Sequence, residues 1–185
     1  MPALRLMAAI AFAVVAGGSA LGQSSGVERS MALFREAGRV LQHPRCLNCH
    51  PAGDSPTQTD AMRPHQPLVV RGANGLGAPG LPCSACHHGA NDEAAGVPGH
   101  AGWQLAPATM AWAGRSLGAI CTQIKDPALN GGRDLSALLR HVSEPSLLSW
   151  AWSPGARRTP APGTQAEFAQ LIRDWIDGGA ACPPP

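Results

Sequence analysis

Two copies of one short pattern hold the residue types in this chain that are best suited to chemistry. Residues 46–50 read Cys-Leu-Asn-Cys-His, and residues 83–87 read Cys-Ser-Ala-Cys-His. C-x-x-C-H is the attachment signature of a c-type haem, in which two thiols bind one porphyrin edge and the next residue is the proximal iron ligand. The repeat predicts two covalently bound haems. The attachment residues are Cys46, Cys49, Cys83 and Cys86, and the proximal ligands are His50 and His87.

Two other uses of paired cysteines explain less of the pattern. Two C-x-x-C pairs can hold a structural zinc ion, but Cys49 and Cys83 lie further apart than in the usual zinc ribbon. Zinc also gives no reason for a histidine after each pair. A thioredoxin-like dithiol would need a strand before the motif within a βαβ unit, which the sequence does not show.

The second axial ligand of each iron has to come from elsewhere in the chain. His65 lies between two prolines, which stiffen the segment that would present its imidazole. His141 falls near the end of an expected helix, close to its apolar face. We predict His65 and His141 as the distal ligands, without assigning either to a particular haem. His88 and the thioether of Met110 remain alternatives.

The first residues resemble the signal peptide of an exported protein. Arg5 precedes an apolar run at residues 6–16, and small residues at 20–22 form a cleavage site before Gln23. We expect a signal peptide at residues 1–22, a single domain at residues 23–185, a periplasmic location and no membrane span after signal removal. Cys121 and Cys182 would then form a disulfide bond, the alternative being two free buried thiols.

The composition fits a core that is built partly from cofactors. The chain has 22 Gly, 18 Pro, no Tyr and 3 Phe among 185 residues, so apolar side chains are few for a core of this size. Two buried porphyrins would supply the missing apolar mass and order the loops around them. The formal net charge of +2 does not suggest nucleic-acid binding. Nearly all basic residues are arginines, and some are expected to pair with haem propionates.

Apolar periodicity predicts helices on both sides of a long loop. The first should cover residues 26–42 with a capping box of Ser25 and Glu28. Two more are expected at residues 115–125 and 135–142. The last should follow a capping box of Thr164 and Glu167 and end at Gly178. Residues 51–82 form the loop, with a strand-like piece at 68–70. The expected fold class is mainly α with long irregular loops, a small dihaem cytochrome c domain organised around two haems.

Several segments together resemble a bacterial family of small exported dihaem proteins, often labelled isoquinoline 1-oxidoreductase subunit. The resemblance covers most of the mature chain and rests on residues 44–51, 64–65, 71–72, 83–87, 103, 123–127 and 130–133. The label implies an electron-accepting partner of a molybdenum hydroxylase. The chain itself has no motif for molybdopterin or iron–sulfur binding.

These observations predict a periplasmic electron-transfer protein with two haem c groups. It would accept electrons from a dehydrogenase and pass them to a respiratory acceptor, so its partners would be redox proteins. Two irons with all axial positions filled would leave no site for a substrate, which favours a carrier over a catalyst. The alternatives are a small haem enzyme of oxidase or peroxidase type, or a haem sensor with one open or exchangeable iron position.

Overall fold

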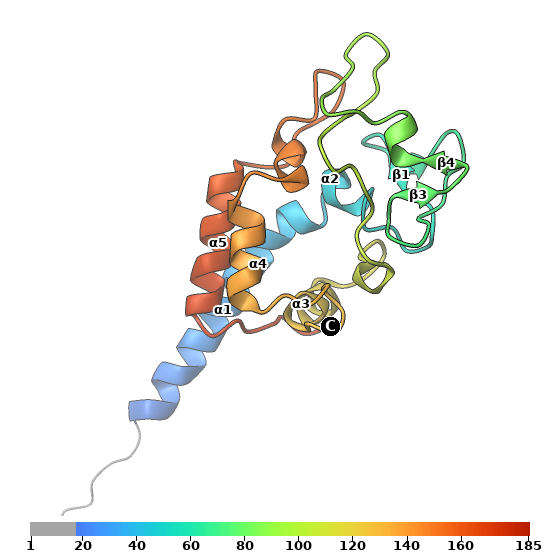
Figure 1. Cartoon of the computed structure of the whole chain (residues 1–185). Coiled ribbons are helices and arrows are strands. Elements are labelled where there is room, and N and C mark those ends of the chain that lie inside the picture. Colours follow the sequence, from blue (N-terminus) through green and yellow to red (C-terminus); the bar gives the residue numbers. More distant parts are fainter. Residues whose placement is uncertain (1–17) are drawn as a thin grey trace, which may run out of the picture.

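The regular elements of this chain are mostly helices, as the sequence predicts. The computed structural model describes residues 18–185. Helices α1 and α5 pack together, α4 packs on α5, and the loop-rich segment between α2 and α3 lies on the other side of the molecule (Figure 1). The helices are α1 (Gly18–Leu41), α2 (Pro44–Leu47), α3 (Leu117–Lys125), α4 (Leu135–Ser143) and α5 (Gln165–Asp177), with short 3-10 helices at Cys83–Ala85, Ala108–Met110 and Leu147–Trp152.

Helix α1 begins earlier than the sequence indicates. It starts at Gly18, so Ser25 lies within the helix and the expected capping box with Glu28 does not mark its beginning. Residues 20 and 21 are Ala and Leu, which have high helix propensity, and no proline interrupts the segment. Most of the expected signal peptide, residues 1–17, lies outside the described residues. Residues 18–22 form the start of α1.

The three later helices each begin with a side-chain cap, and those of α4 and α5 are the ones that the sequence predicts, Asp134 and the pair Thr164 and Glu167. The Ser116 hydroxyl caps α3, and Asp134 Oδ1 caps α4 by accepting a hydrogen bond from the backbone of Ala137 at 2.7 Å. In α5, the backbone N–H of Thr164 donates to Glu167 Oε2 at 2.8 Å, and Glu167 donates back to the Thr164 hydroxyl at 3.1 Å. This reciprocal pair is the predicted capping box.

The long loop contains two small hairpins rather than the expected strand at 68–70. One pairs β1 (Thr57–Gln58) with β2 (Arg63–Pro64), and the other pairs β3 (Gly77–Ala78) with β4 (Leu81–Pro82). The apolar residues Leu68 and Val70 are exposed instead. The strand prediction is therefore wrong, because an apolar run forms a strand only where a neighbouring segment offers backbone partners.

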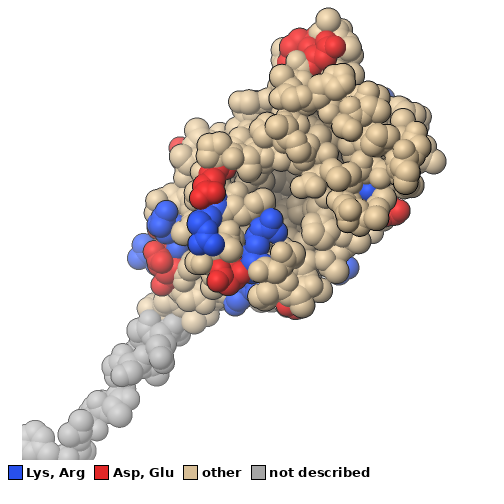
Figure 2. Space-filling model, viewed as in Figure 1, with Lys and Arg blue, Asp and Glu red and all other residues tan. Residues whose placement is uncertain are grey.

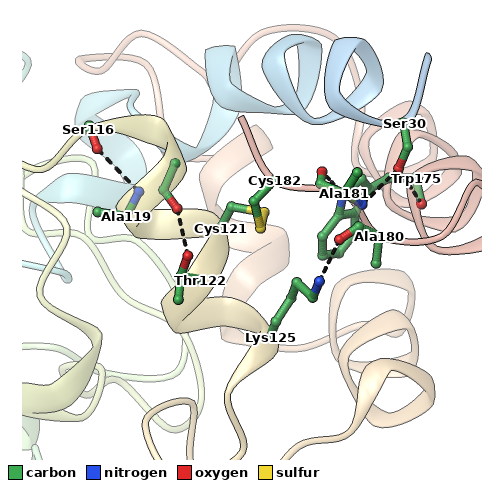
Figure 3. Close-up of a disulfide and its surroundings, with 11 residues drawn as sticks. Ser30, Ser116, Ala119, Cys121, Thr122, Lys125, Trp175, Ala180, Ala181 and Cys182 are labelled. Carbon is green, nitrogen blue, oxygen red and sulfur yellow. Dashed lines mark hydrogen bonds between the residues drawn. A yellow bond between two sulfur atoms is a disulfide. The ribbon is translucent and has the colours of Figure 1, made fainter. Parts of the chain in front are cut away.

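The core joins α1, α3 and α5, and the predicted disulfide bond closes it. The rings of Phe34 and Trp175 meet with centroids 4.9 Å apart, and both residues are fully buried. Cys121 on α3 is bonded to Cys182, as Figure 3 shows. Buried Ser30 on α1 donates to the Trp175 carbonyl and accepts from the Ala181 N–H, both at 3.0 Å. These contacts fix the chain after α5 against α1 and α3.

Within residues 18–185, no helix combines the length and the apolar character needed to cross a bilayer.

Candidate cofactor-binding sites

The first C-x-x-C-H segment is delivered by the junction between α1 and α2. His43 caps α2 by accepting a hydrogen bond from the Arg45 N–H, and Pro44 occupies the first helical turn, where its missing N–H has no consequence. The next turn is closed by the His50 N–H, which donates to the Cys46 carbonyl at 3.0 Å. This turn holds Cys46, Cys49 and His50 close together.

The second segment repeats this backbone pattern in a different setting. It begins with the 3-10 helix after β4, and the His87 N–H donates to the Cys83 carbonyl at 2.9 Å. Cys83 is half-buried and Cys86 is exposed. The two motifs therefore share one local geometry, although one follows a long helix and the other follows a hairpin.

All four motif cysteines are free thiols, and three of them have raised pKa values. Burial raises the pKa of Cys46 to about 12 and that of Cys49 to about 11. Burial also raises the pKa of Cys83. Catalytic dithiols have lowered pKa values, so these shifts argue against a thioredoxin-like role.

Both motif histidines are oriented by a backbone carbonyl. His50 Nδ1–H donates to the Met110 carbonyl at 2.7 Å, and His87 Nδ1–H donates to the Pro98 carbonyl at 2.7 Å. A carbonyl can only accept, so in each ring Nε2 keeps its lone pair. Burial lowers the pKa of His50 to about 4 and also lowers that of His87. Two neutral imidazoles with free Nε2 atoms result, which is the state that binds a metal.

Each motif histidine also stacks on a tryptophan. The His50 ring lies parallel to Trp112 with centroids 3.5 Å apart, and the His87 ring lies parallel to Trp103 at 4.5 Å. Trp103 in turn meets Trp150 edge-on at 4.9 Å. The tryptophans keep the imidazoles from rotating and make the surroundings apolar.

Each motif opens into its own cavity. The first-motif cavity, about 570 Å³, is lined by Cys46, Cys49 and His50. The second-motif cavity, about 410 Å³, is lined by Cys83, Cys86 and His87. Both volumes lie within the range of cofactor pockets. The two cavities adjoin, because they share wall residues: Arg45, Cys49, Trp103, Gln104, Leu105 and Trp150.

The second-motif cavity brings His65 opposite His87. Their ring centroids are 5.9 Å apart, and His65 Nδ1–H donates to the Pro67 carbonyl at 2.8 Å, which leaves its Nε2 free. Two imidazoles on opposite sides of one metal ion have centroids roughly 6 Å apart, given metal–nitrogen bonds of about 2 Å. The centroid separation of His65 and His87 matches this value, and their ring planes are inclined at 61°.

The first-motif cavity contains His141 as well as His50. His141 comes from the last turn of α4 and belongs to the cavity lining. Its pKa is lowered, first by burial and then by the charge of Arg133. His141 is nevertheless an exposed residue, and what separates it from exposed His88 is that it lines a cavity. The structure thus groups His141 with His50 and His65 with His87, a pairing that the sequence leaves open.

The structure places the other sequence candidates as follows. His88 is exposed and lines neither cavity. Met110 is buried in the wall of the first-motif cavity, and its carbonyl is the acceptor that orients His50. His100, for which the sequence predicts no ligand role, lines the first-motif cavity together with His141 and donates Nδ1–H to the Ala101 carbonyl at 2.8 Å, which leaves its Nε2 free.

The motif cysteines and histidines are not gathered into one cluster of donors in the described residues. In the part of the chain that the structure describes, no three His, Cys, Asp or Glu side chains come together as a metal cluster. The donor sets of the two motifs instead fit haem c: two thiols on one side, an oriented imidazole beside them, apolar walls and a second histidine in the same cavity.

The sequence reasoning missed the residues that orient and enclose the ligands. The carbonyls of Met110 and Pro98 and the ring of Trp112 leave no local signal, because they depend on long-range packing. Arg45 is buried and borders both cavities. Arg45 directly precedes the first motif cysteine, which could have indicated a place in the site. Arginines are mostly exposed in proteins, however, so the sequence favours a surface position.

Comparison of the chain with protein-family models, with curated proteins and with solved structures yields no match.

Proposed function

We propose that this protein is a periplasmic dihaem c-type cytochrome that transfers electrons between redox proteins. One observation carries the proposal. Each C-x-x-C-H segment opens into a separate cavity that also contains a second histidine, His141 with His50 and His65 with His87. Two independent ligand pairs, each beside its own pair of thiols, are what two covalent haems require.

The haem supplies reversible one-electron chemistry when it is bound, and the residues of this chain control it. Cysteines fix the porphyrin edge, while the carbonyls of Met110 and Pro98 hold Nδ1–H of the proximal rings and so fix their orientation. Trp103 and Trp112 cover these rings and exclude water. His65 and His141 would hold the irons as second ligands, beside His87 and His50, and would leave no position for a substrate. This arrangement favours a carrier over an enzyme.

The proposed partners are a dehydrogenase that donates electrons and a respiratory acceptor. The resemblance to dihaem proteins labelled isoquinoline 1-oxidoreductase subunit makes a molybdenum hydroxylase one candidate donor. On the face shown in Figure 2, charged side chains gather over the helical side and reach one edge of the central hollow, whereas the opposite edge is largely uncharged. Short-lived contacts between redox proteins bury small interfaces.

A second candidate function is a haem enzyme or sensor at the first-motif cavity. The observation that favours it is the looser placement of His141. His65, His50 and His87 each donate Nδ1–H to a carbonyl, whereas His141 has no hydrogen bond within residues 18–185. A distal ligand without such a bond is the easier one to exchange for a small molecule.

The proposal is tested by counting covalent haem in the exported holoprotein. Acid-acetone extraction should leave two haems on the wild-type chain, and one on each of the variants C46A/C49A and C83A/C86A. The matched control is C121A/C182A, which also loses two cysteines and should keep both haems. Extraction that removes all haem from the wild-type chain contradicts the proposal, as does a motif variant that retains two.

A further inference from the structure

The charged side chains that line the two cavities are all arginines. Arg45 and Arg158 line the second-motif cavity, and Arg45 and Arg133 line the first-motif cavity. Within the described chain, no Asp or Glu belongs to either lining. Arg45 is thus shared, whereas Arg158 and Arg133 each belong to one cavity. A lining whose charge is only positive is suited to an anionic group.

Arg45 belongs to the wall that the two cavities share. Its side chain is 1% exposed, and its guanidinium carbon lies 5.6 Å from the ring centre of Trp150. One end of the guanidinium pairs with Asp60, whose other oxygen accepts two hydrogen bonds from Thr159. Its Nε has no partner among the described residues. A buried cation with one partly exposed carboxylate partner is incompletely compensated, so it favours negative charge in the adjoining cavities.

Arg158 and Arg133 are half-buried and are fixed by backbone acceptors. Arg158 donates to the Pro154 carbonyl at 3.0 Å and to the Gly96 carbonyl, and Arg133 Nη1 donates to the Asn130 carbonyl at 2.9 Å. Neither arginine forms an ion pair within residues 18–185. A guanidinium has five N–H donors, so each keeps donors for an acceptor inside its cavity.

We propose that these arginines form a divided carboxylate-binding wall, in which Arg158 binds a propionate of the second-motif haem, Arg133 binds one of the first-motif haem, and Arg45 supplies positive charge to both. The inference rests on the proposed function, because the propionates are the carboxylates of the haem. Positive charge near an iron favours the reduced, more electron-rich form. Each arginine therefore raises the reduction potential of the haem that it faces.

A redox titration of the holoprotein and its variants tests the division. R158Q should lower one of the two midpoint potentials and R133Q the other, while R45Q should lower both. R158Q/R133Q should lower both midpoint potentials, because the two arginines line different cavities. The conservative variants R158K and R133K should show smaller shifts than the glutamine variants, because lysine keeps the positive charge but lacks the planar guanidinium group. The matched control is R157Q, which removes the same charge from the exposed neighbour of Arg158.

The pattern of shifts decides the outcome. The inference is overturned when R158Q and R133Q shift the midpoint potentials no more than R157Q does. It is also overturned when both variants shift the same potential. R45Q removes a buried charge, so it tests the effect of Arg45 on both haems only when the variant folds. R158Q and R133Q decide without it whether each arginine acts on a separate haem. Haem counts taken on the same samples separate the two claims. Two covalent haems with unchanged potentials reject the arginine wall alone, whereas a chain without covalent haem rejects the proposed function.

Discussion

At the scale of single residues, the orientation of each imidazole is set by its Nδ1 hydrogen bond. His50, His87 and His65 all donate Nδ1–H to a backbone carbonyl, at 2.7 to 2.8 Å. The same bond leaves Nε2 available and makes it more basic, which strengthens it as a ligand. Pro98 follows His87 by 11 residues in a loop, whereas Met110 lies 60 residues after His50, in the short 3-10 helix Ala108–Met110. The loops therefore help to build the sites that they surround.

The assignment of distal ligands can be tested one histidine at a time. H65A should remove one of the two bis-histidine low-spin signals from the electron paramagnetic resonance spectrum. H141A should remove the other, because the two histidines line different cavities. H88A is the matched control, since His88 is exposed and lines neither cavity. A lost low-spin signal in H88A, or two unchanged signals in H65A, contradicts the assignment.

Trp112 allows a separate test of what the stacked ring contributes. It is 7% exposed and lies against His50, but its indole N–H has no partner within the described residues. W112F keeps an aromatic ring and removes the unpaired donor, so the free energy of unfolding should stay within about 1 kcal/mol of the wild type or rise. W112A removes the ring and should cost about 3–5 kcal/mol. Chemical denaturation measures both; a large loss in W112F would show that the N–H has a partner in the holoprotein.

At the scale of elements, the disulfide bond ties the end of the chain to α3. Cys121 and Cys182 are 61 residues apart in sequence, and Lys125 Nζ adds a hydrogen bond to the Ala180 carbonyl at 2.7 Å. The contacts of Ser30 hold the same segment to α1 (Figure 3). The helical side of the molecule is thus closed by covalent and polar links that do not involve the cavities.

Removal of the disulfide bond should therefore lower stability without removing haem. In the chain-entropy model, a loop of this length contributes about 4 kcal/mol to the free energy of unfolding. We expect C121S/C182S to lose about that amount in denaturant titrations and to keep two covalent haems. The single variant S143A, on the exposed end of α4, is the control and should change stability by less than about 1 kcal/mol. An unchanged unfolding midpoint in C121S/C182S would show that the bond does not form.

The elements that the sequence predicts well are those with local signals at both ends. Helix α5 has a capping box at its start and Gly178 at its end, and Asp134 marks the start of α4. Helix α1 was placed too late because Ser25 and Glu28 imitate a start signal inside a continuing helix. The hairpins of the long loop were missed because two-residue strands have no periodicity to detect.

The candidate site shows the same division between local and long-range information. The roles proposed for the four motif cysteines and for His50 and His87 are predicted from a five-residue pattern alone. The grouping of His65 with His87 depends on the path of residues 51–82, which no local rule determines. The structure supplies this grouping through the 5.9 Å separation of the two rings.

At the scale of the whole molecule, the two cavities lie against each other between the helical and the loop-rich sides. Their shared wall includes Cys49, Trp103 and Trp150, so no separate layer of protein stands between the cavities. Adjacent cofactors would act as one electron-transfer unit, in which the charge of one iron changes the potential of the other. Two bound cofactors would also complete a core that has few apolar side chains.

The most direct test of this account is electron paramagnetic resonance combined with near-infrared magnetic circular dichroism on the oxidised holoprotein. These spectra count the irons and identify their axial ligands. The account predicts two low-spin irons, each with two histidine ligands. A high-spin iron that changes on addition of cyanide or nitric oxide would contradict it and would favour an enzyme or a sensor.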